Sequence, residues 1–273
     1  MPGRFLAASL ATLLCFASGW AQSPLAVHFV PAEVVQRRLE VVPQRLGDRR
    51  QELEALFREA GCTDRLREQR VPHNPQPNVI CALPGDGAGE IIAGGHFDLV
   101  DVGSGAVDDW SGVSLLPSLF QTLKIGRRRH TFVFIGFAGE ETGLQGSKAY
   151  VQSLPPEGRT AIRAMVNLEC LGLALPKVWA SRADPELLKA YVRVAGSMNL
   201  PPEAVNVDNA GDDDSHPFLD AHIPVLTIHS VTSQTFGILH SRRDTLQAIH
   251  PAEYYEAYRL AAAYLTYLDS VLP

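Results

Sequence analysis

Hydrophobic and polar positions divide the chain into short apolar runs and longer amphipathic stretches that alternate along it. Short, nearly continuous apolar runs are typical of strands that are covered on both faces of a sheet. The strand-like runs are RLREQRV, NVICAL, EIIAGG, TFVFIGFA, AMVNL, KVWA and IPVLTIH. Helical periodicity covers residues 32–60, 109–124 and 251–271, with a break near Pro43 and an end at Gly61.

Strands that alternate with helices predict an α/β fold. We therefore expect a mostly parallel, mixed central sheet with helices on both faces. The first two strand-like runs are joined by a Pro-rich loop, PHNPQP, rather than by a helix. No internal repeat or low-complexity tract divides the chain, so we expect one domain of ordinary size.

The N-terminal segment has the features of an export signal. Arg4 precedes an apolar run over residues 5–16, and small residues follow it before Gln22. We expect residues 1–21 to be a cleaved signal peptide, residues 22–273 to form a single domain, and the protein to be secreted or periplasmic. An uncleaved anchor is the alternative. The run is shorter than the roughly 20 residues that a membrane-spanning helix needs, so we expect no stable membrane insertion.

The composition is typical of a soluble globular protein, with 46% hydrophobic and 20% charged residues. A net charge of −6 argues against a nucleic-acid partner, because the only basic run, residues 127–129, is typical of a solvated turn. Beyond the signal, the cysteines are Cys62, Cys81 and Cys170. An oxidising compartment favours a Cys62–Cys81 disulfide, because each lies in an early segment that could pair as neighbouring strands. Free buried cysteines are an equally good alternative.

Titratable side chains stand at or beyond the carboxyl ends of the apolar runs. In open α/β sheets ligands bind at that edge, so we expect four separate segments to deliver polar groups to one crevice. The residues are His96, Asp98, Glu140, Glu141, Glu169 and His240, the last lying one loop beyond its run.

This donor set indicates a metal site. It combines histidines with a surplus of carboxylates, and no serine or cysteine stands in a nucleophile elbow. Crowded carboxylates repel one another unless cations hold them, and zinc accepts both imidazole nitrogen and carboxylate oxygen. Two ions that share a bridging carboxylate would use the set well, and Asp108 is the candidate bridge. Its neighbour Asp109 fits this site or a helix cap.

Two pairs of neighbouring residues suggest distinct roles. In HFD, His96 is a candidate ligand and Asp98 its orienter, which accepts the second imidazole N–H; a surface pair is the alternative. Adjacent glutamates directly after a buried run are costly unless they are paired. We assign Glu141 as a metal ligand and Glu140 as the general base for a water whose pKa zinc lowers. An exposed acidic loop is the other interpretation of this pair.

Five motifs in order, GGHFD, GAVDDWSG, FAGEETGLQGS, MVNLE and LHSRRDTLQAI, resemble the M28 family of zinc peptidases, which includes bacterial aminopeptidases. The resemblance covers residues 78–249. It implies a zinc-dependent exopeptidase with two Zn²⁺ per chain, and a peptide substrate with a free N-terminus whose first peptide bond is hydrolysed. It further implies His96 as ligand of one ion, Asp108 as bridge, Glu141 and His240 as ligands of the opposite ion, and Glu140 as general base.

The sequence departs from the family pattern at two places. Glu169 stands where the family usually has aspartate, so the longer side chain must bind from a more retracted backbone or hold its ion more weakly. In DDDSHPFLDAHIP the usual Ser-Asp-His order is shifted, and we expect His216 to be a surface histidine rather than a substrate-side group. The family also implies a cis peptide bond between Asp108 and Asp109.

Two alternative functions share this fold. A glutaminyl cyclase is an acyltransferase that works with one zinc, and such enzymes tend to carry Asp-Ser where this chain has Asp108 and Asp109. A binding module without catalysis is the other alternative, although every expected position holds a competent residue. The pattern favours no oligomeric state. Phe218, Ile228 and Phe236 either line a side-chain pocket or belong to the core.

Overall fold

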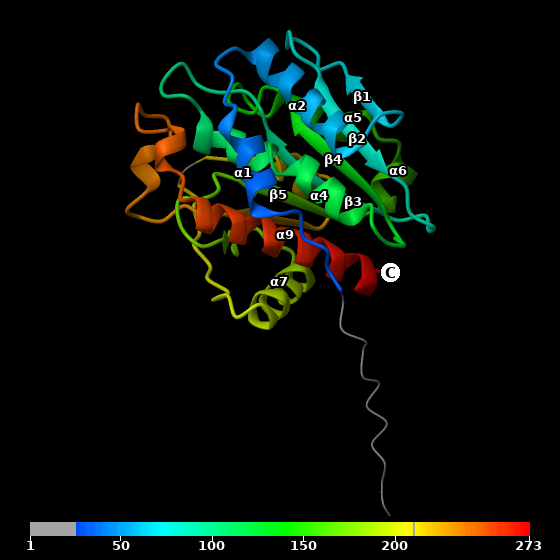
Figure 1. Ribbon diagram of the computed structural model, residues 1–273. Coiled ribbons are helices and arrows are strands. Elements are labelled where there is room, and N and C mark those ends of the chain that lie inside the picture. The colour runs from blue at the N-terminus through cyan, green and yellow to red at the C-terminus, as the bar shows by residue number, and fades with distance from the viewer. Residues whose placement is uncertain (1–25, 210) are drawn as a thin grey trace, which may run out of the picture.

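The computed structural model describes residues 26–209 and 211–273, so the predicted signal peptide over residues 1–21 lies outside the described part. Within it, seven strands form one sheet in the order β1-β2-β4-β3-β5-β7-β6 (Figure 1). The strands are β1 (Leu66–Gln69), β2 (Asn78–Leu83), β3 (Glu90–His96), β4 (Thr131–Phe137), β5 (Ile162–Glu169), β6 (Lys177–Val178) and β7 (Val225–His229).

The four central strands, β4, β3, β5 and β7, run parallel to one another. β1 and β2 continue the sheet antiparallel at one edge, and β6 pairs antiparallel with β7 at the other. The predicted mostly parallel, mixed sheet is therefore confirmed. Because β3, β4 and β5 point the same way, their carboxyl ends meet at one edge of the sheet.

Helices cover both faces of the sheet. On one face pack α1, α2, α4, α7 and α9, and on the other pack α5 and α8. Figure 1 places α1, α4 and α9 across the front of the strands. The helices are α1 (Ala32–Glu40), α2 (Leu46–Ala60), α3 (Ser111–Val113), α4 (Leu116–Leu123), α5 (Gln145–Ser153), α6 (Pro156–Ala161), α7 (Pro185–Ser197), α8 (His216–Asp220) and α9 (Pro251–Val271), with short turns η1 (Ala106–Trp110), η2 (Phe236–Ile238) and η3 (Leu246–Ala248).

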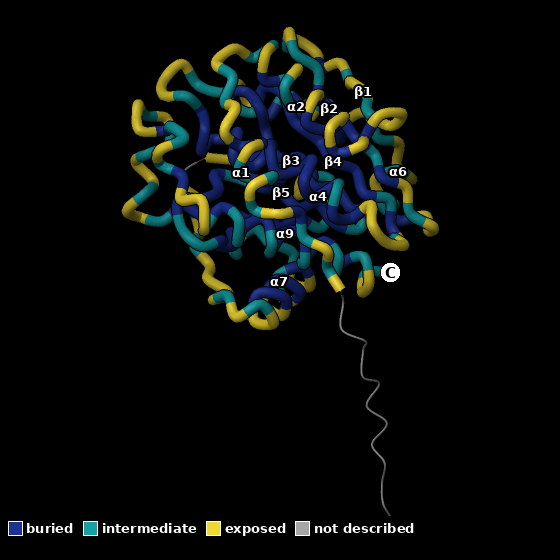
Figure 2. Tube along the Cα trace, in the orientation of Figure 1, coloured by how far each residue is buried: buried dark blue, intermediate teal, exposed yellow. Residues whose placement is uncertain are grey.

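The run that forms β4 is almost entirely apolar because both of its faces are buried. Phe132 and Phe134 belong to the core beneath α4 and α9, whereas Val133, Ile135 and Phe137 point into the core beneath α5 and α8. Side chains alternate between the faces of a strand, and both faces here are covered. The central strands are accordingly buried along their length in Figure 2.

The predicted helix over residues 109–124 is wrong as a single element. η1 and α3 precede α4, and Asp108 and Asp109 have non-helical backbone angles inside η1. Their side chains and backbone bond to distant segments, and these contacts outweigh the local helical preference. KVWA likewise contributes only a two-residue strand, β6. The break near Pro43, the end at Gly61 and the helix over 251–271 are all observed.

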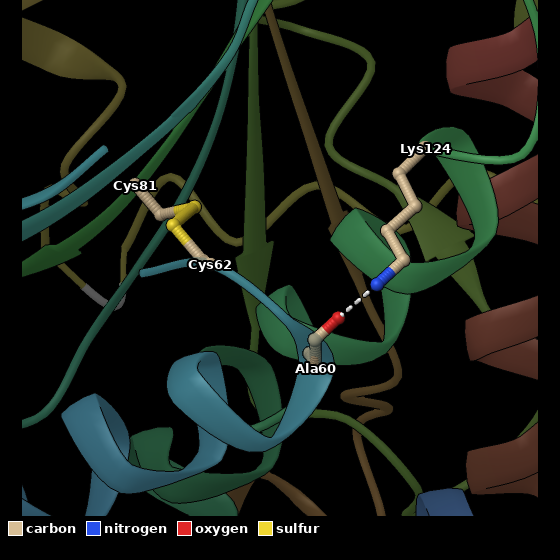
Figure 3. Close-up of a disulfide and its surroundings, with 4 residues drawn as sticks. All are labelled: Ala60, Cys62, Cys81 and Lys124. Carbon is tan, nitrogen blue, oxygen red and sulfur yellow. Dashed lines mark hydrogen bonds between the residues drawn. A yellow bond between two sulfur atoms is a disulfide. The ribbon is translucent and has the colours of Figure 1, made fainter. Parts of the chain in front are cut away.

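Cys62 and Cys81 form a disulfide, with their Cα atoms 6.4 Å apart (Figure 3). The expected pairing is correct, but Cys62 lies in the turn after α2 and not on a strand next to β2. The bond therefore fastens the end of α2 to the sheet. Beside it, Lys124 Nζ donates to the Ala60 carbonyl at 2.6 Å, which joins the end of α2 to the end of α4. Among the described residues no helix is long and apolar enough to cross a membrane.

Candidate metal centre

The predicted site residues meet at the carboxyl edge of the parallel strands. His96 ends β3, Glu169 ends β5, and Glu140 and Glu141 follow the end of β4. His240 comes from the segment between η2 and η3, far along the chain from the strand that precedes it. Four separate segments thus deliver their side chains to one place, as the alternation of strands and helices predicts.

The first donor group surrounds the imidazole of His96. Its Nε2 atom lies 3.1 Å from Asp108 Oδ1 and 3.4 Å from Glu169 Oε1. The His96 side chain is fully buried, and the two carboxylates are nearly so. Two carboxylate oxygens therefore lie within hydrogen-bonding distance of one imidazole nitrogen inside the protein.

The second donor group uses the other oxygen of Asp108. Asp108 Oδ2 lies 3.2 Å from His240 Nε2, which is also 3.1 Å from Glu141 Oε2. Asp108 thus turns one carboxylate oxygen to each group. His240 is the most exposed member of the two groups, with 58% of its side chain accessible, so the second group opens to solvent.

Asp98 holds the loop that carries both glutamates. Its Oδ1 accepts the backbone N–H groups of Gly139 and Glu140 at 2.9 and 3.0 Å, and its Oδ2 accepts that of Glu141 at 3.1 Å. Oδ1 also lies 3.5 Å from His96 Nδ1, on the side of the ring away from the donor group. Burial alone would raise the pKa of Asp98, but His96 and these backbone bonds hold it below its usual value.

The cluster carries more carboxylates than its own cations can balance. Burial, reinforced by the carboxylates of Glu169 and Asp214, raises the pKa of Glu140 to about 10. Burial and the charge of Asp108 raise the pKa of Glu141 to about 7. The hydrogen bond to Asp108 raises the pKa of His240 to about 9. Without divalent cations the site would hold protons that such cations displace.

The donor atoms fit zinc in chemistry and spacing. Nitrogen and oxygen ligands about 2.0–2.1 Å from a tetrahedral zinc lie about 3.3 Å apart, close to the separations in both groups. Glu141 Oε1 is also buried without a hydrogen-bond partner among the described residues, as expected of an atom kept for a ligand. The residues present therefore fit a pair of zinc ions.

Asp109 is a positioning residue that the sequence left open between cap and site. Its Oδ1 accepts the N–H of Gly112, inside α3, at 3.0 Å, and also the N–H of Cys170 at 2.9 Å. Its Oδ2 accepts the N–H of His96 at 3.3 Å. Gly112 is required there, because a Cβ would lie 2.2 Å from the Leu168 carbonyl oxygen. The cis peptide bond between Asp108 and Asp109 is present as expected.

Sequence reasoning missed two other residues that shape the site. Asp244 accepts the N–H of Val107 at 2.7 Å and that of Asp108 at 3.3 Å, and its place in the LHSRRDTLQAI motif was a signal for it. Arg49 is buried in α2 and donates to four backbone carbonyls, two of which precede η1 directly. One of several arginines in a charged helix gives no such signal in the sequence.

A cavity of about 490 Å³ opens beside the donor groups. Acidic side chains from the groups form part of its wall, and Leu144, Trp179, Val231 and Leu239 supply apolar surface. Phe236 also lines it and is partly exposed, whereas Phe218 and Ile228 are fully buried core residues. His216 lies outside both donor groups and pairs with Asp212 and Asp220, as expected of a surface histidine.

Comparisons with known proteins agree with this geometry. A model of peptidase family M28 matches residues 78–265. The chain is 30% identical over 151 residues to leupeptin-inactivating enzyme 1 of Streptomyces exfoliatus, which covers 54% of this chain and 34% of that protein. It is 31% identical over 134 residues to leucine aminopeptidase 1 of Trichoderma harzianum, covering 44% and 33%. The chain thus spans about a third of the length of these relatives.

Solved structures share the fold at low sequence identity. The Legionella pneumophila LapA aminopeptidase superposes with a TM-score of 0.73 at 19% identity, covering 88% of this chain and 70% of that one. A glutaminyl cyclase from an Acidobacteriales bacterium superposes with a TM-score of 0.75 at 18% identity, covering 91% and 99%. At these identities the likeness concerns the fold alone.

Proposed function

The chain belongs to peptidase family M28, and we propose that it is a zinc-dependent exopeptidase of the aminopeptidase type, with two ions in one site. The observation that carries the proposal is the orientation of Asp108, whose two oxygens face two separate donor groups 3.1 and 3.2 Å from their histidines. One carboxylate between two imidazole-containing groups is the arrangement that a bridged pair of cations needs.

In this proposal each donor group holds one ion. His96, Asp108 and Glu169 are ligands of the first, and Asp108, Glu141 and His240 are ligands of the second. Zinc bound there supplies Lewis-acid chemistry: it acidifies water and polarises the scissile carbonyl. Most of these ligands are held in place: His96 and Glu169 lie at strand ends, and Asp98 accepts the backbone N–H of Glu141. Asp244 accepts the backbone N–H of Asp108 in the same way.

Glu140 is the proposed general base. A carboxylate oxygen of Glu140 lies within 4.8 Å of ligand atoms of His96 and Glu141, so it borders both donor groups without completing either. From this position it takes a proton from the attacking water and returns it to the nitrogen of the departing amine. Asp98 fixes the backbone N–H of Glu140 and thereby the direction of this carboxylate.

The proposed substrate is a peptide with a free N-terminus. A protonated or metal-facing amine is attracted by the acidic wall of the cavity, whereas the apolar surface next to it receives the first side chain. The carboxylates and the apolar groups that line the cavity therefore favour a peptide with a free amine and an apolar first residue over an N-blocked peptide.

The test is a kinetic comparison of Glu140→Gln with the wild type, combined with metal analysis of both proteins. We expect two zinc ions per chain in each, hydrolysis of aminoacyl substrates but not of their N-acetyl forms by the wild type, and a kcat about 10²–10⁴-fold lower in the variant. Glu157→Gln, an exposed residue of α6, is the matched control and should retain wild-type kcat. Unchanged turnover in Glu140→Gln would overturn the assignment.

A glutaminyl cyclase is the second candidate, because the Acidobacteriales enzyme matches nearly the whole of both chains. The bridging orientation of Asp108 favours two ions and therefore the peptidase. One zinc per chain, together with cyclisation of an N-terminal glutamine and no hydrolysis of aminoacyl substrates, would decide for the cyclase.

We also propose that the protein acts outside the cytoplasm, in the periplasm or after secretion. The disulfide between Cys62 and Cys81 supports this, since such bonds persist in oxidising compartments. N-terminal sequencing of the exported protein should begin at Gln22; an intact Met1 on the exported protein would contradict a cleaved signal.

A further inference from the structure

A second cavity lies next to the one beside the donor groups. It has a volume of about 240 Å³ and shares Val207, Val231 and Phe236 with the first cavity. We call these three shared residues the collar. The residues that line only the second cavity are Val205, Asn206, Asn209, Thr232 and Ser233. None of them belongs to a donor group, so the second cavity leads away from the metal centre.

Hydrogen bonds hold the segments that carry the collar. His229 is buried at the end of β7. Its Nε2 donates to the Val205 carbonyl at 2.9 Å, and its Nδ1 accepts the N–H of Val231 at 3.1 Å. The Phe236 N–H donates to the Thr232 carbonyl at 2.9 Å. One imidazole thus joins the two segments, and the collar is positioned before a substrate binds.

Trp179 adds a fixed aromatic surface to the first cavity. Its Nε1 donates to Ser181 Oγ at 2.9 Å and to Asp208 Oδ1 at 3.0 Å. The guanidinium of Arg182 lies 4.0 Å from the centroid of the indole ring, so it covers one face of the ring. Trp179 and the collar therefore supply a rigid apolar surface against which a substrate side chain can pack.

The second cavity differs from the first in polarity. Aspartates, glutamates and a lysine line the first cavity, whereas no charged residue among the described ones lines the second. The polar groups of the second cavity are the amides of Asn206 and Asn209 and the hydroxyls of Thr232 and Ser233. Such groups can hydrogen-bond a hydroxyl or an amide, and they offer no ion pair to a charged group. The two cavities together therefore match a side chain with a long apolar body and a neutral polar end.

We propose that the pocket for the first residue of the substrate extends along the collar into the second cavity, and that the protein prefers N-terminal tyrosine to leucine. The inference rests on the exopeptidase function proposed above. The amine and the scissile carbonyl must both face the donor groups, so the first side chain enters the apolar part of the cavity. A tyrosine ring packs along the collar with its hydroxyl toward the neutral polar groups, whereas the shorter leucine side chain buries less surface there.

The test compares kcat/KM for Tyr-Gly-NH₂ and Leu-Gly-NH₂, which share their second residue. We expect the zinc-loaded wild type to favour the tyrosine peptide about tenfold, since a single methylene group in a pocket changes kcat/KM by about 10-fold or more. Ser233→Trp fills the second cavity and should lower this ratio about tenfold. Gln234→Trp is the matched control: this residue is exposed, lines neither cavity, and should keep the wild-type ratio and turnover.

The outcomes separate this inference from the proposed function. Hydrolysis of both peptides without a preference for tyrosine, or a ratio that Ser233→Trp leaves unchanged, would overturn the inference and leave the exopeptidase function standing. The same holds if Ser233→Trp instead alters the ratio between Leu-Tyr-NH₂ and Leu-Gly-NH₂, because the second cavity would then bind the second residue. No hydrolysis of any of these peptides by the wild type would overturn both. Should Ser233→Trp be inactive toward every peptide, Asn209→Trp, at an exposed position that lines only the second cavity, takes its place.

Discussion

Replacing Asp109 with alanine should destabilise the protein even when no metal is present. The carboxylate is fully buried and accepts three backbone N–H groups, from His96, Gly112 and Cys170. Each belongs to a different segment: the end of β3, the start of α3 and the residue after β5. A buried N–H left without an acceptor costs about 1–3 kcal/mol, so three of them cost about 3–9 kcal/mol.

The burial of Asp109 and its closeness to Glu169 set where in this range the loss of stability falls. Burial and the nearby Glu169 carboxylate raise the pKa of Asp109 well above its usual value, so removing this carboxyl relieves part of an unfavourable burial. We therefore expect the lower half of the range, about 3–6 kcal/mol, for Asp109→Ala. Asp109→Asn retains an oxygen for two of the N–H groups and turns its amide toward the third, so about 1–3 kcal/mol is expected.

The assay is urea unfolding of the chelator-treated proteins, which removes any contribution from bound ions. Asp64→Ala, an exposed aspartate with no partner among the described residues, is the control and should unfold like the wild type within about 0.5 kcal/mol. A loss below about 1 kcal/mol in Asp109→Ala, or equal losses in the alanine and asparagine variants, would refute the hydrogen-bond argument.

Three further outcomes follow from the same contacts. Arg49→Met removes donors to four backbone carbonyls and should lower the free energy of unfolding by about 4 kcal/mol in urea; a smaller loss than in the disulfide variant would contradict this. The double variant Cys62→Ser, Cys81→Ser opens a loop with a sequence separation of 19 and should cost about 3 kcal/mol, measured by thermal unfolding without reductant. Chelation of one ion present at about 100 times its Kd removes about 2.7 kcal/mol. In calorimetry it should lower Tm by about 5–10 °C, and an unchanged Tm would mean that no ion was bound.

The sequence predicted those elements in which successive side chains have the same kind of environment. After Thr131, β4 has no polar side chain because both faces of the sheet are covered, and a run of that kind can be recognised without knowing its neighbours. The segment after residue 106 could not be recognised, because Asp109 accepts hydrogen bonds from His96 at the end of β3 and from Cys170. Helical periodicity reports on local preference and carries no information about partners 13 or 61 residues away.

The donor residues could be found from sequence because parallel strands bring their carboxyl ends together. Their division into two groups could not be derived in that way, and only the resemblance to the family implied it. His240 shows why: it lies well beyond β7 on an irregular segment with φ = 52°, and no pattern fixes where such a segment returns. Asp98 and Asp244 accept hydrogen bonds from backbone N–H groups. Nearly every residue carries such a group, so the sequence does not indicate which residues these carboxylates bind.

The glutamate at position 169 is explained by its neighbour on the same strand. Asn167 lies two residues earlier, so its side chain points to the same face, and its Nδ2 donates to Glu169 Oε2 at 3.0 Å. Asn167 Nδ2 is itself held against Asp213 Oδ2 at 3.2 Å. The extra methylene is thus anchored through one oxygen, and the other, Oε1, is left 3.4 Å from His96 Nε2. A longer side chain pinned in this way presents one oxygen toward His96, as a shorter aspartate would.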